Sequence, residues 1–366
     1  KDIPARYALA QTLEQTQNWR GAAGHYLGIL EAEPTHLDSL SRMGQIYLLG
    51  RNIEKAEEHA EKILAQNPAD ADGLTLRAGT KSFQADLDGA KLDVIAALDA
   101  TPGHPNASAL LASLYLREGD SGKSIETLQG ALEYEPKNAT ISTLLARVHT
   151  QLGNTDEAAK VYQQIVDNEP AVLGHRLRLS NFHVSQDQKD EAEAVLKTTV
   201  TDIDDVNAKL AYAEFLAKNR SAQLAAETLE KMIIDDPDEY RLRFALGKLF
   251  EAANEMDQAT KVYQAIIDKT DGDESSPFAL SATTRLAVVE ARKGNVEQSF
   301  ELVEQVLSEN PRDQEALKLR GTLSLTKGDA AAAIADYRAG LRDDANNAGL
   351  LRLLARAHLI NGEIDL

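Results

Sequence analysis

Proline recurs along this chain of 366 residues at a fixed interval. Proline lacks the amide hydrogen that a helix interior needs, so each recurrence marks the end of one helix and the start of the next structural repeat. Five of these prolines follow one another at steps of 34 residues, and two more continue the series after changes in spacing: Pro34, Pro68, Pro102, Pro136, Pro170, Pro237 and Pro311. This regular punctuation predicts an array of similar repeats.

Glycine and small residues keep the same period. Glycines separated by 34 residues lie about midway between the prolines, at Gly119 and Gly153 and again at Gly294, Gly328 and Gly362. Because glycine adopts the left-handed conformation that ends a helix, these positions predict a turn between two helices of each repeat. A small residue at one fixed place would let the two helices approach closely. These small residues are Ala22, Ala56, Ala90, Ser124, Ala158, Ala192, Ala225 and Ala259.

The composition favours helices and argues against several classes of partner and site. The chain is 43% hydrophobic but only 5% aromatic, which is typical of an Ala- and Leu-rich helical protein. Its 58 acidic and 39 basic residues give a net charge of -19, so we expect no binding to nucleic acid. The absence of cysteine excludes disulfides, thiolate zinc sites and iron–sulfur clusters. No stretch approaches the roughly 18 apolar residues of a membrane span, so we expect no membrane insertion.

The repeat resembles that of the tetratricopeptide repeat family, which has the same period and the motif W-x2-L-G-x2-Y, then A-x3-F, then A and P. Repeat two carries this motif as Leu40, Met43, Gly44, Tyr47, Ala56, Ala60, Ile63 and Pro68. The resemblance covers essentially the whole chain, although the family's first tryptophan is absent from every repeat. It implies an all-α, right-handed superhelical solenoid of about ten and a half helix–turn–helix repeats.

The repeat marks divide the chain into three segments. Residues 1–270 hold repeats one to eight, residues 271–279 form an acidic loop insertion, and residues 280–366 hold repeats nine, ten and the first helix of repeat eleven. The insertion is a candidate hinge because it reads DGDESSP from Asp271 to Pro277. Since no polar capping helix precedes repeat one and the last repeat is cut short, we expect a fragment of a longer array. The predicted repeat starts are Ile3, Leu37, Ala71, Pro105, Ala139, Leu173, Val206, Tyr240, Leu280, Gln314 and Ala348.

No motif in the sequence indicates catalysis or a cofactor. The nearest approach to a phosphate-binding loop is GDSGKS at Gly119–Ser124, but Arg117 stands where such a loop needs glycine. The carboxylates of Asp271, Asp273 and Glu274 lack the distal glutamate of a calcium-binding loop, so we interpret them as a solvated loop. We therefore predict no enzyme activity, no cofactor and no metal site.

The chain has eight histidines that could be metal ligands, and three of them occur at a repeat position that is aromatic elsewhere. His149, His183 and His358 fall where Tyr47 and Tyr115 lie in other repeats. This periodicity favours packing between helices over metal ligation.

The first helices of stacked repeats are expected to line the concave side of the solenoid. Positions two, five, nine and twelve of a repeat point away from its packing positions and therefore towards this groove. The groove becomes more basic towards its C-terminal end, and we expect it to hold a protein or peptide segment, with an acidic polymer at that end as a further candidate. The alternative is that these side chains are merely solvated. The predicted partner-binding residues are Gln45, Ser113, Thr143, Arg147, Asn181, Glu214, Phe244, Lys248, Arg285 and Arg352.

The carboxylate clamp known from co-chaperone repeats is not present. That clamp pairs lysine at position five with asparagine at position nine, whereas repeat six combines Asn181 with Leu177.

These observations predict a non-catalytic protein–protein interaction scaffold. Its Ala-, Gln-, Asp- and Glu-rich repeats without cysteine are similar to long bacterial envelope arrays that accompany exopolysaccharide synthesis, export or surface-protein sorting. This resemblance implies a periplasmic or cell-envelope location rather than a cytoplasmic one. Two alternatives stay open: a cytosolic adaptor that recruits one client protein, and the substrate-recognition region of a larger enzyme.

Overall fold

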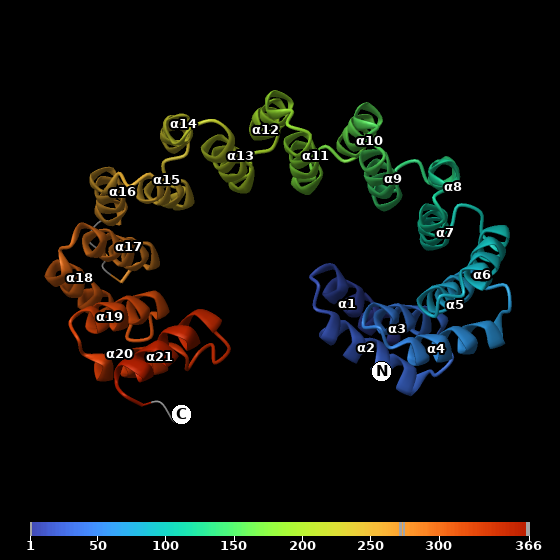
Figure 1. The fold of residues 1–366 in the computed structure, drawn as a ribbon, viewed down its shortest axis with the longest axis horizontal. Coiled ribbons are helices and arrows are strands. Elements are labelled where there is room, and N and C mark those ends of the chain that lie inside the picture. The colour runs from blue at the N-terminus through green and yellow to red at the C-terminus, as the bar shows by residue number, and fades with distance from the viewer. Residues whose placement is uncertain (1, 271–272, 274, 364–366) are drawn as a thin grey trace. The chain divides into compact units, whose positions relative to one another are not determined.

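The repeats are pairs of α-helices joined by short turns in the computed structural model (Figure 1). The structure describes residues 2–270, 273 and 275–363, and over these residues it contains helices α1 to α21 and no strand. The prediction of an all-α repeat solenoid is therefore confirmed. The chain divides into two compact units, Lys1–Asp187 and Gln188–Leu366, which we call the N-terminal and C-terminal units and describe separately.

The N-terminal unit holds repeats one to five and the first helix of repeat six. Its helices are α1 (Ile3–Gln15), α2 (Trp19–Ala32), α3 (Leu37–Leu49), α4 (Ile53–Gln66), α5 (Ala71–Phe83), α6 (Leu87–Ala100), α7 (Pro105–Glu118), α8 (Ser121–Tyr134), α9 (Ala139–Gln151), α10 (Thr155–Asn168) and α11 (Leu173–Ser185). Consecutive first helices contact one another, α3 with α5, α5 with α7, and α7 with α9. We call the surface formed by the first helices of one unit its first-helix face.

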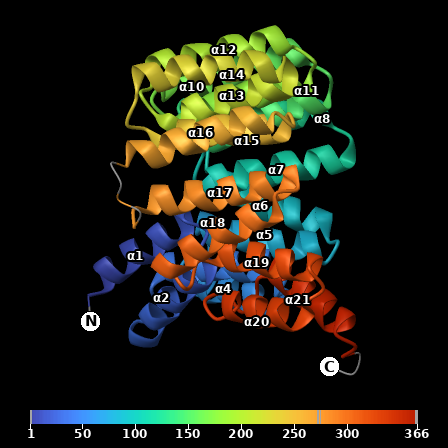
Figure 2. The same cartoon turned by 90° about the vertical axis from the view of Figure 1, so that its left-hand side faces the viewer.

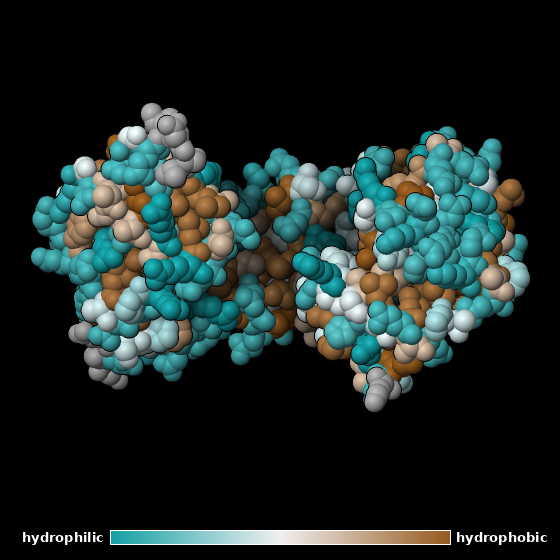
Figure 3. Space-filling view, turned by 90° about the horizontal axis from the view of Figure 1, so that it is seen from below, coloured by the Kyte–Doolittle hydropathy of each residue, from teal (hydrophilic) through white to brown (hydrophobic). Residues whose placement is uncertain are grey.

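The C-terminal unit holds the second helix of repeat six and the repeats that follow. Its helices are α12 (Lys189–Asp202), α13 (Val206–Asn219), α14 (Ala222–Asp235), α15 (Tyr240–Ala252), α16 (Met256–Lys269), α17 (Pro277–Lys293), α18 (Val296–Glu309), α19 (Gln314–Thr326), α20 (Ala330–Gly340) and α21 (Ala348–Ile360). First helices again contact one another, and Figure 2 shows α15, α17 and α19 in succession. In the view of Figure 3, hydrophilic side chains cover most of the visible surface, with smaller hydrophobic areas among them.

The predicted repeat starts coincide with the starts of first helices, with one exception. In repeat nine, α17 begins at Pro277, three residues before the predicted start at Leu280. Proline is well suited to the first position of a helix because its fixed φ is helical and no hydrogen bond is lost there. The final three residues of the predicted insertion, 277–279, are thus helical. Residues 271, 272 and 274 lie outside the described part of the chain, so the hinge stays a prediction.

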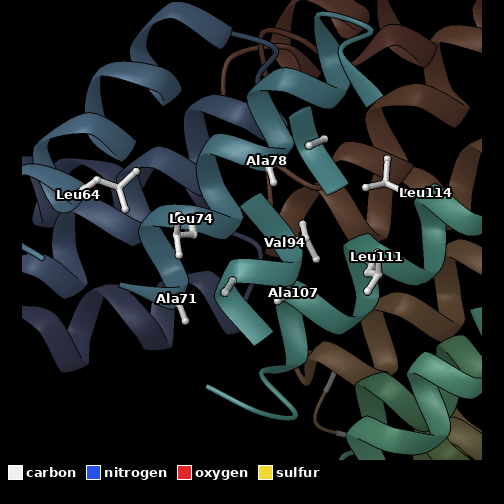
Figure 4. Close-up of a cluster of buried hydrophobic side chains, with 10 residues drawn as sticks. Leu64, Ala71, Leu74, Ala78, Val94, Ala107, Leu111 and Leu114 are labelled. Carbon is white, nitrogen blue, oxygen red and sulfur yellow. The ribbon is translucent and has the colours of Figure 1, made fainter. Parts of the chain in front are cut away.

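The small residues of the repeat are all buried where helices meet. Each member of the predicted series from Ala22 to Ala259 has an exposed fraction of 0%, and the series continues at Ser299 and Ala333 after the insertion. A typical core cluster joins α4, α5, α6 and α7 through Leu64, Leu74, Val94 and Leu111 (Figure 4). The tight approach predicted from the small residues is confirmed.

The turn between the two helices of a repeat contains one left-handed residue in every repeat except repeat seven, where Arg220 (φ -122°) and Ser221 (φ -151°) have negative φ. The five glycines predicted for this place have positive φ, for example 82° at Gly119. In other repeats the same place holds a residue with a side chain, including Gln17 (φ 59°), Arg51 (57°), Ala85 (66°) and Asn254 (61°). A left-handed backbone is strained in L-residues other than glycine, so these repeats carry a local cost that their packing offsets.

Exchanging glycine and alanine at this turn should change stability in opposite directions. At Gly119 an added Cβ would meet no atom within 4 Å, so only backbone strain counts. We expect Gly119→Ala to lower the free energy of unfolding by about 1 kcal/mol. Ala85→Gly should relieve this strain and raise the free energy of unfolding by up to about 1 kcal/mol. The gain is reduced because glycine gives the unfolded chain more conformational entropy. Urea unfolding followed by circular dichroism measures both, and changes of equal sign would contradict the assignment.

Candidate partner-binding site

Each unit has a sizeable cavity that opens on its first-helix face, and we call these the C-terminal and N-terminal cavities. The C-terminal cavity has a volume of about 630 Å³ and is lined from α13, α15, α17 and the start of α19. The N-terminal cavity has a volume of about 570 Å³ and is lined by residues of α3, α5 and α7, together with Arg51 of the turn that follows α3. Both volumes fall within the range of roughly 300 to 1,000 Å³ that is usual for ligand sites.

The wall of the C-terminal cavity is largely apolar. Phe244 of α15 and Phe278 of α17 line it together with Leu210 of α13. The ring of Phe278 is stacked on that of Tyr240, with centroids 4.3 Å apart and planes 10° from parallel. Phe278 nevertheless keeps an exposed fraction of 44%, which leaves a fixed aromatic surface available to a partner.

Two cations of this cavity are unpaired. Lys248 is exposed and Arg285 is half-buried, and among the described residues neither has a hydrogen-bond or ion-pair partner. By contrast, the guanidinium of Arg241 lies 3.2 Å from the carboxylate of Glu239, and this hydrogen bond raises the pKa of Arg241 against the effect of its partial burial.

The acidic residues at the rim of the cavity already have partners. The carboxylate of Asp313 caps α19 by accepting a hydrogen bond from the backbone amide of Ala316 at 2.9 Å. Glu315 lies 3.6 Å from the ammonium group of Lys318. Asp313 keeps its charge because a backbone amide neutralises none, so among the described residues the unpaired charges that line the cavity are two cations, Lys248 and Arg285, against one carboxylate.

A buried tyrosine supports the helix that carries Phe244 and Lys248. Tyr263 of α16 has an exposed fraction of 0%, and its hydroxyl donates a hydrogen bond to Glu251 of α15 at 2.5 Å. Burial, followed by this hydrogen bond, raises the pKa of the tyrosine well above its usual value. A Cβ on Gly247 would lie 2.5 Å from the ring, so only glycine lets α15 pack this closely.

The same arrangement occurs in repeat ten. Tyr337 of α20 is fully buried, and a Cβ on Gly321 of α19 would lie 2.6 Å from its ring. In both repeats the ring and the glycine fix the distance between the two helices.

The N-terminal cavity offers a different chemistry. Leu48, Leu76 and Phe83 give it an apolar wall, and its charged lining residues are Arg51 and Asp72. The carboxylate of Asp72 lies 3.4 Å from the imidazole of His104, and the hydrogen bond from His104 lowers the pKa of Asp72 despite its burial. This cavity lacks the pair of cations found in the C-terminal unit.

The family of the chain follows from its sequence matches. The tetratricopeptide repeat model matches residues 7–71, 109–172, 216–274, 244–313 and 284–348, which together make up well over half of the chain. This chain belongs to the tetratricopeptide repeat family. Proteins of this family generally act as scaffolds that bind protein or peptide partners, so the coarse prediction of a protein–protein interaction scaffold is supported.

Solved tetratricopeptide repeat structures are similar to the chain only at low identity. Yeast Tom70 is 12% identical with a TM-score of 0.45, over 99% of this chain and 96% of that one. The thermophilic protein TTC0263 of Thermus thermophilus is 18% identical with a TM-score of 0.45, over 50% and 99% respectively. The pilF protein of Pseudomonas aeruginosa is 16% identical with a TM-score of 0.39, over 59% and 97%. Similarities this weak add no argument about function, and no curated protein sequence matches.

The tetratricopeptide repeats bring several of the predicted site residues together. Phe244, Lys248 and Arg285 line the C-terminal cavity, and Gln45 lines the N-terminal one. The other predicted residues line neither cavity. Their role in partner binding stays a prediction.

Three of those other residues use their polar groups within their own helix. The hydroxyl of Thr143 donates to the carbonyl of Ala139 at 2.6 Å. Glu214 is paired with Lys218 at 2.5 Å. The Nε of Arg352 donates to the carbonyl of Ala348 at 3.2 Å. The remaining three, Ser113, Arg147 and Asn181, are exposed on α7, α9 and α11.

Sequence reasoning missed Phe278 as a lining residue of the cavity and Tyr240 as the residue on which its ring is stacked. Phe278 falls within the predicted insertion, although the preceding Ser276-Pro277 is a recognisable helix start. The stacking of its ring on Tyr240 depends on how two repeats pack, for which the sequence carries no signal.

The histidines and carboxylates singled out in the sequence form no metal site in the described ranges. His149 and His358 have exposed fractions of 7% and 9%, which confirms the packing interpretation for these two histidines. Within those ranges, no group of three or more His, Asp or Glu side chains is placed to hold a metal ion. Asp271 and Glu274 of the carboxylate cluster fall outside them. Across the described helices, none has the length and apolar character needed to cross a membrane.

Proposed function

We propose that this chain is a non-catalytic scaffold that binds an extended or helical segment of a partner protein along its first-helix faces. The observation that carries this proposal is the position of the two cavities, of about 630 and 570 Å³, which both open on first helices. Within one unit, a partner segment could anchor an apolar side chain in the cavity while its backbone follows exposed residues of the neighbouring first helices.

Position nine of the repeat gives such a segment a series of contact points. In repeats four to eight, this position is exposed in every repeat, at Ser113, Arg147, Asn181, Glu214 and Lys248. Position nine lies at the same level along each first helix. Within each unit, its side chains therefore form a row across the first-helix face. A row of varied polar groups suits an extended partner better than a single compact ligand.

We further propose that the scaffold works in the periplasm or cell envelope of a bacterium, in an assembly that exports polysaccharide or protein. The support is the likeness of its cysteine-free, Ala-, Gln-, Asp- and Glu-rich repeats to long envelope arrays. Fractionation of cells that make the protein naturally tests this location, and recovery with cytosolic markers would favour the adaptor instead.

Site-specific photo-crosslinking tests the choice of face. A photoreactive phenylalanine analogue is placed at Ser113, which is exposed on α7, or at Gln129, which is exposed on the second helix α8 of the same repeat. In cells that make the protein naturally, the Ser113 probe should capture a defined partner and the Gln129 probe should not. Equal capture by both probes, or capture by Gln129 alone, would contradict binding along the first-helix face.

A further inference from the structure

We infer that the C-terminal cavity recognises an acidic peptide segment that carries a large apolar side chain. This inference rests on the proposed function and gives the chemistry of one binding site within it. It draws on two properties of the cavity that occur side by side: an aromatic wall and two unpaired cations.

The apolar part of the site is a preformed receptor for one bulky side chain. Phe244 and Phe278 contribute ring surface, and Phe278 is held by its stack on Tyr240 rather than free to fold over the cavity. Such a fixed surface loses little conformational entropy on binding. Burial of an aromatic or long aliphatic side chain of the partner against it therefore favours binding.

The polar part of the site selects a negative charge. Lys248 and Arg285 lie on neighbouring first helices at the same cavity, and neither is neutralised by an acidic residue of the described chain. At the rim, Glu315 is paired with Lys318, while Asp313 caps α19 and keeps its charge, so two unpaired cations stand against one carboxylate in the described part of the cavity wall. A carboxylate of the partner would complete the missing ion pairs.

The net charge of -19 does not prevent this recognition. At physiological ionic strength the Debye length is about 8 Å, so distant exposed acidic residues are largely screened from a bound carboxylate. The two cations at the cavity are within direct reach of it. Local complementarity then outweighs the field of the whole molecule.

A peptide fits this site better than an acidic polysaccharide. The cavity is lined by apolar atoms from Leu210, Phe244, Phe278 and Val288, whereas a charged sugar chain offers mostly hydroxyl and carboxylate groups. Burying those hydroxyls against apolar walls without hydrogen-bond partners would be unfavourable. The polysaccharide is therefore the competing ligand in the test.

Fluorescence anisotropy with a labelled peptide tests the inference on the whole chain. The probe is a short peptide with one phenylalanine between aspartates, and its matched forms carry alanine for phenylalanine or asparagine for the aspartates. We expect saturable binding of the probe and at least about tenfold weaker binding of each matched form. Lys248→Glu should weaken binding of the probe by a similar factor. The same substitution should strengthen binding of a peptide that carries lysine in place of aspartate.

Lys261→Glu is the matched control. Lys261 is also an exposed lysine of repeat eight, but it lies on the second helix α16 away from the cavity. Lys261→Glu should leave the affinity for the probe unchanged. Circular dichroism of Lys248→Glu and Lys261→Glu checks that both variants fold. Equal weakening by Lys248→Glu and Lys261→Glu would overturn the inference, because the effect would then come from net charge alone.

Other outcomes separate this inference from the proposed function. In one outcome, the asparagine peptide binds as tightly as the aspartate peptide, and Phe244→Ala weakens the binding of both peptides. The first-helix face would then bind a partner, as the proposed function requires, but the inferred selectivity for acidic peptides would be wrong. Full displacement of the probe by polygalacturonate at low concentration would overturn the claim that the cavity prefers a peptide, because the site would then bind an acidic polymer. No saturable binding of any peptide would overturn the site itself, while crosslinking at Ser113 would still test the scaffold.

Discussion

Replacing Tyr263 with alanine is expected to lower the free energy of unfolding by about 3 to 5 kcal/mol. The ring is fully buried between α15 and α16, so its removal leaves a cavity that the two helices cannot close without shifting. The change also deprives the buried carboxylate of Glu251, 7% exposed, of a hydrogen bond. Loss of a partner from a buried charged group adds to the cost of the cavity.

Tyr263→Phe separates these two contributions. It keeps the ring and removes only the hydroxyl, while the guanidinium of Arg292 still lies 3.7 Å from Glu251. We expect a loss of about 1 to 3 kcal/mol for this variant. Urea unfolding measures both variants, and hydrogen exchange of α15 and α16 locates the effect. Equal losses for the two variants would contradict the importance of ring packing.

The second large effect is expected for Arg320→Ala in repeat ten. The guanidinium of Arg320 lies 2.7 Å from the carboxylate of Asp336 and 2.8 Å from that of Glu304. These hydrogen bonds raise the pKa of Arg320 despite burial. The Asp336 side chain is only 9% exposed, so removal of the arginine leaves a buried charge without its cation. We expect a loss of about 2 to 4 kcal/mol, reduced from that of a fully buried pair because the Arg320 side chain is 27% exposed.

Arg77→Ala in repeat three is the matched comparison. Arg77 pairs with the buried Asp93 at 2.8 Å in the same way, but Lys81 lies 2.7 Å from that carboxylate and would remain. Burial raises the pKa of Asp93, and the hydrogen bonds from Arg77 and Lys81 outweigh it, so the net pKa is lowered. This group therefore stabilises the fold above its unfolded pKa and loses that effect as the pH falls through the folded value.

The loss for Arg77→Ala should be about 1 kcal/mol, clearly smaller than for Arg320→Ala. Thermal unfolding of the two variants at neutral pH provides the comparison. A larger loss for Arg77→Ala would show that the remaining lysine does not compensate.

The repeat architecture could be predicted from the sequence because local chemistry dictates it. Each proline, each turn glycine and each small residue such as Ala158 has one structural role that recurs at every repeat. The N-cap residues of the helices form a further recurring series in the sequence, which the prediction did not use. Asp or Asn caps many of the helices, for example at Asp70, Asp86, Asp120 and Asn138.

The binding site could be predicted only in part. The repeat register placed Phe244 and Lys248 on the first-helix face because their spacing follows from helix geometry. Whether a side chain there is available depends on its neighbours, and Glu214 is engaged by Lys218 while Lys248 has no such partner among the described residues. The contribution of Phe278 depends on a helix that begins inside the insertion, which breaks the period.

The pairing of a glycine with a tyrosine ring in repeats eight and ten has a consequence for protein engineering. A chimera that transplants only the second helix of repeat eight onto a first helix with a larger residue at the place of Gly247 would force the Tyr263 ring out of its pocket. The two residues therefore have to be exchanged together, as one module. Libraries built by shuffling these repeats should keep whole helical hairpins intact and vary only the residues that face a partner.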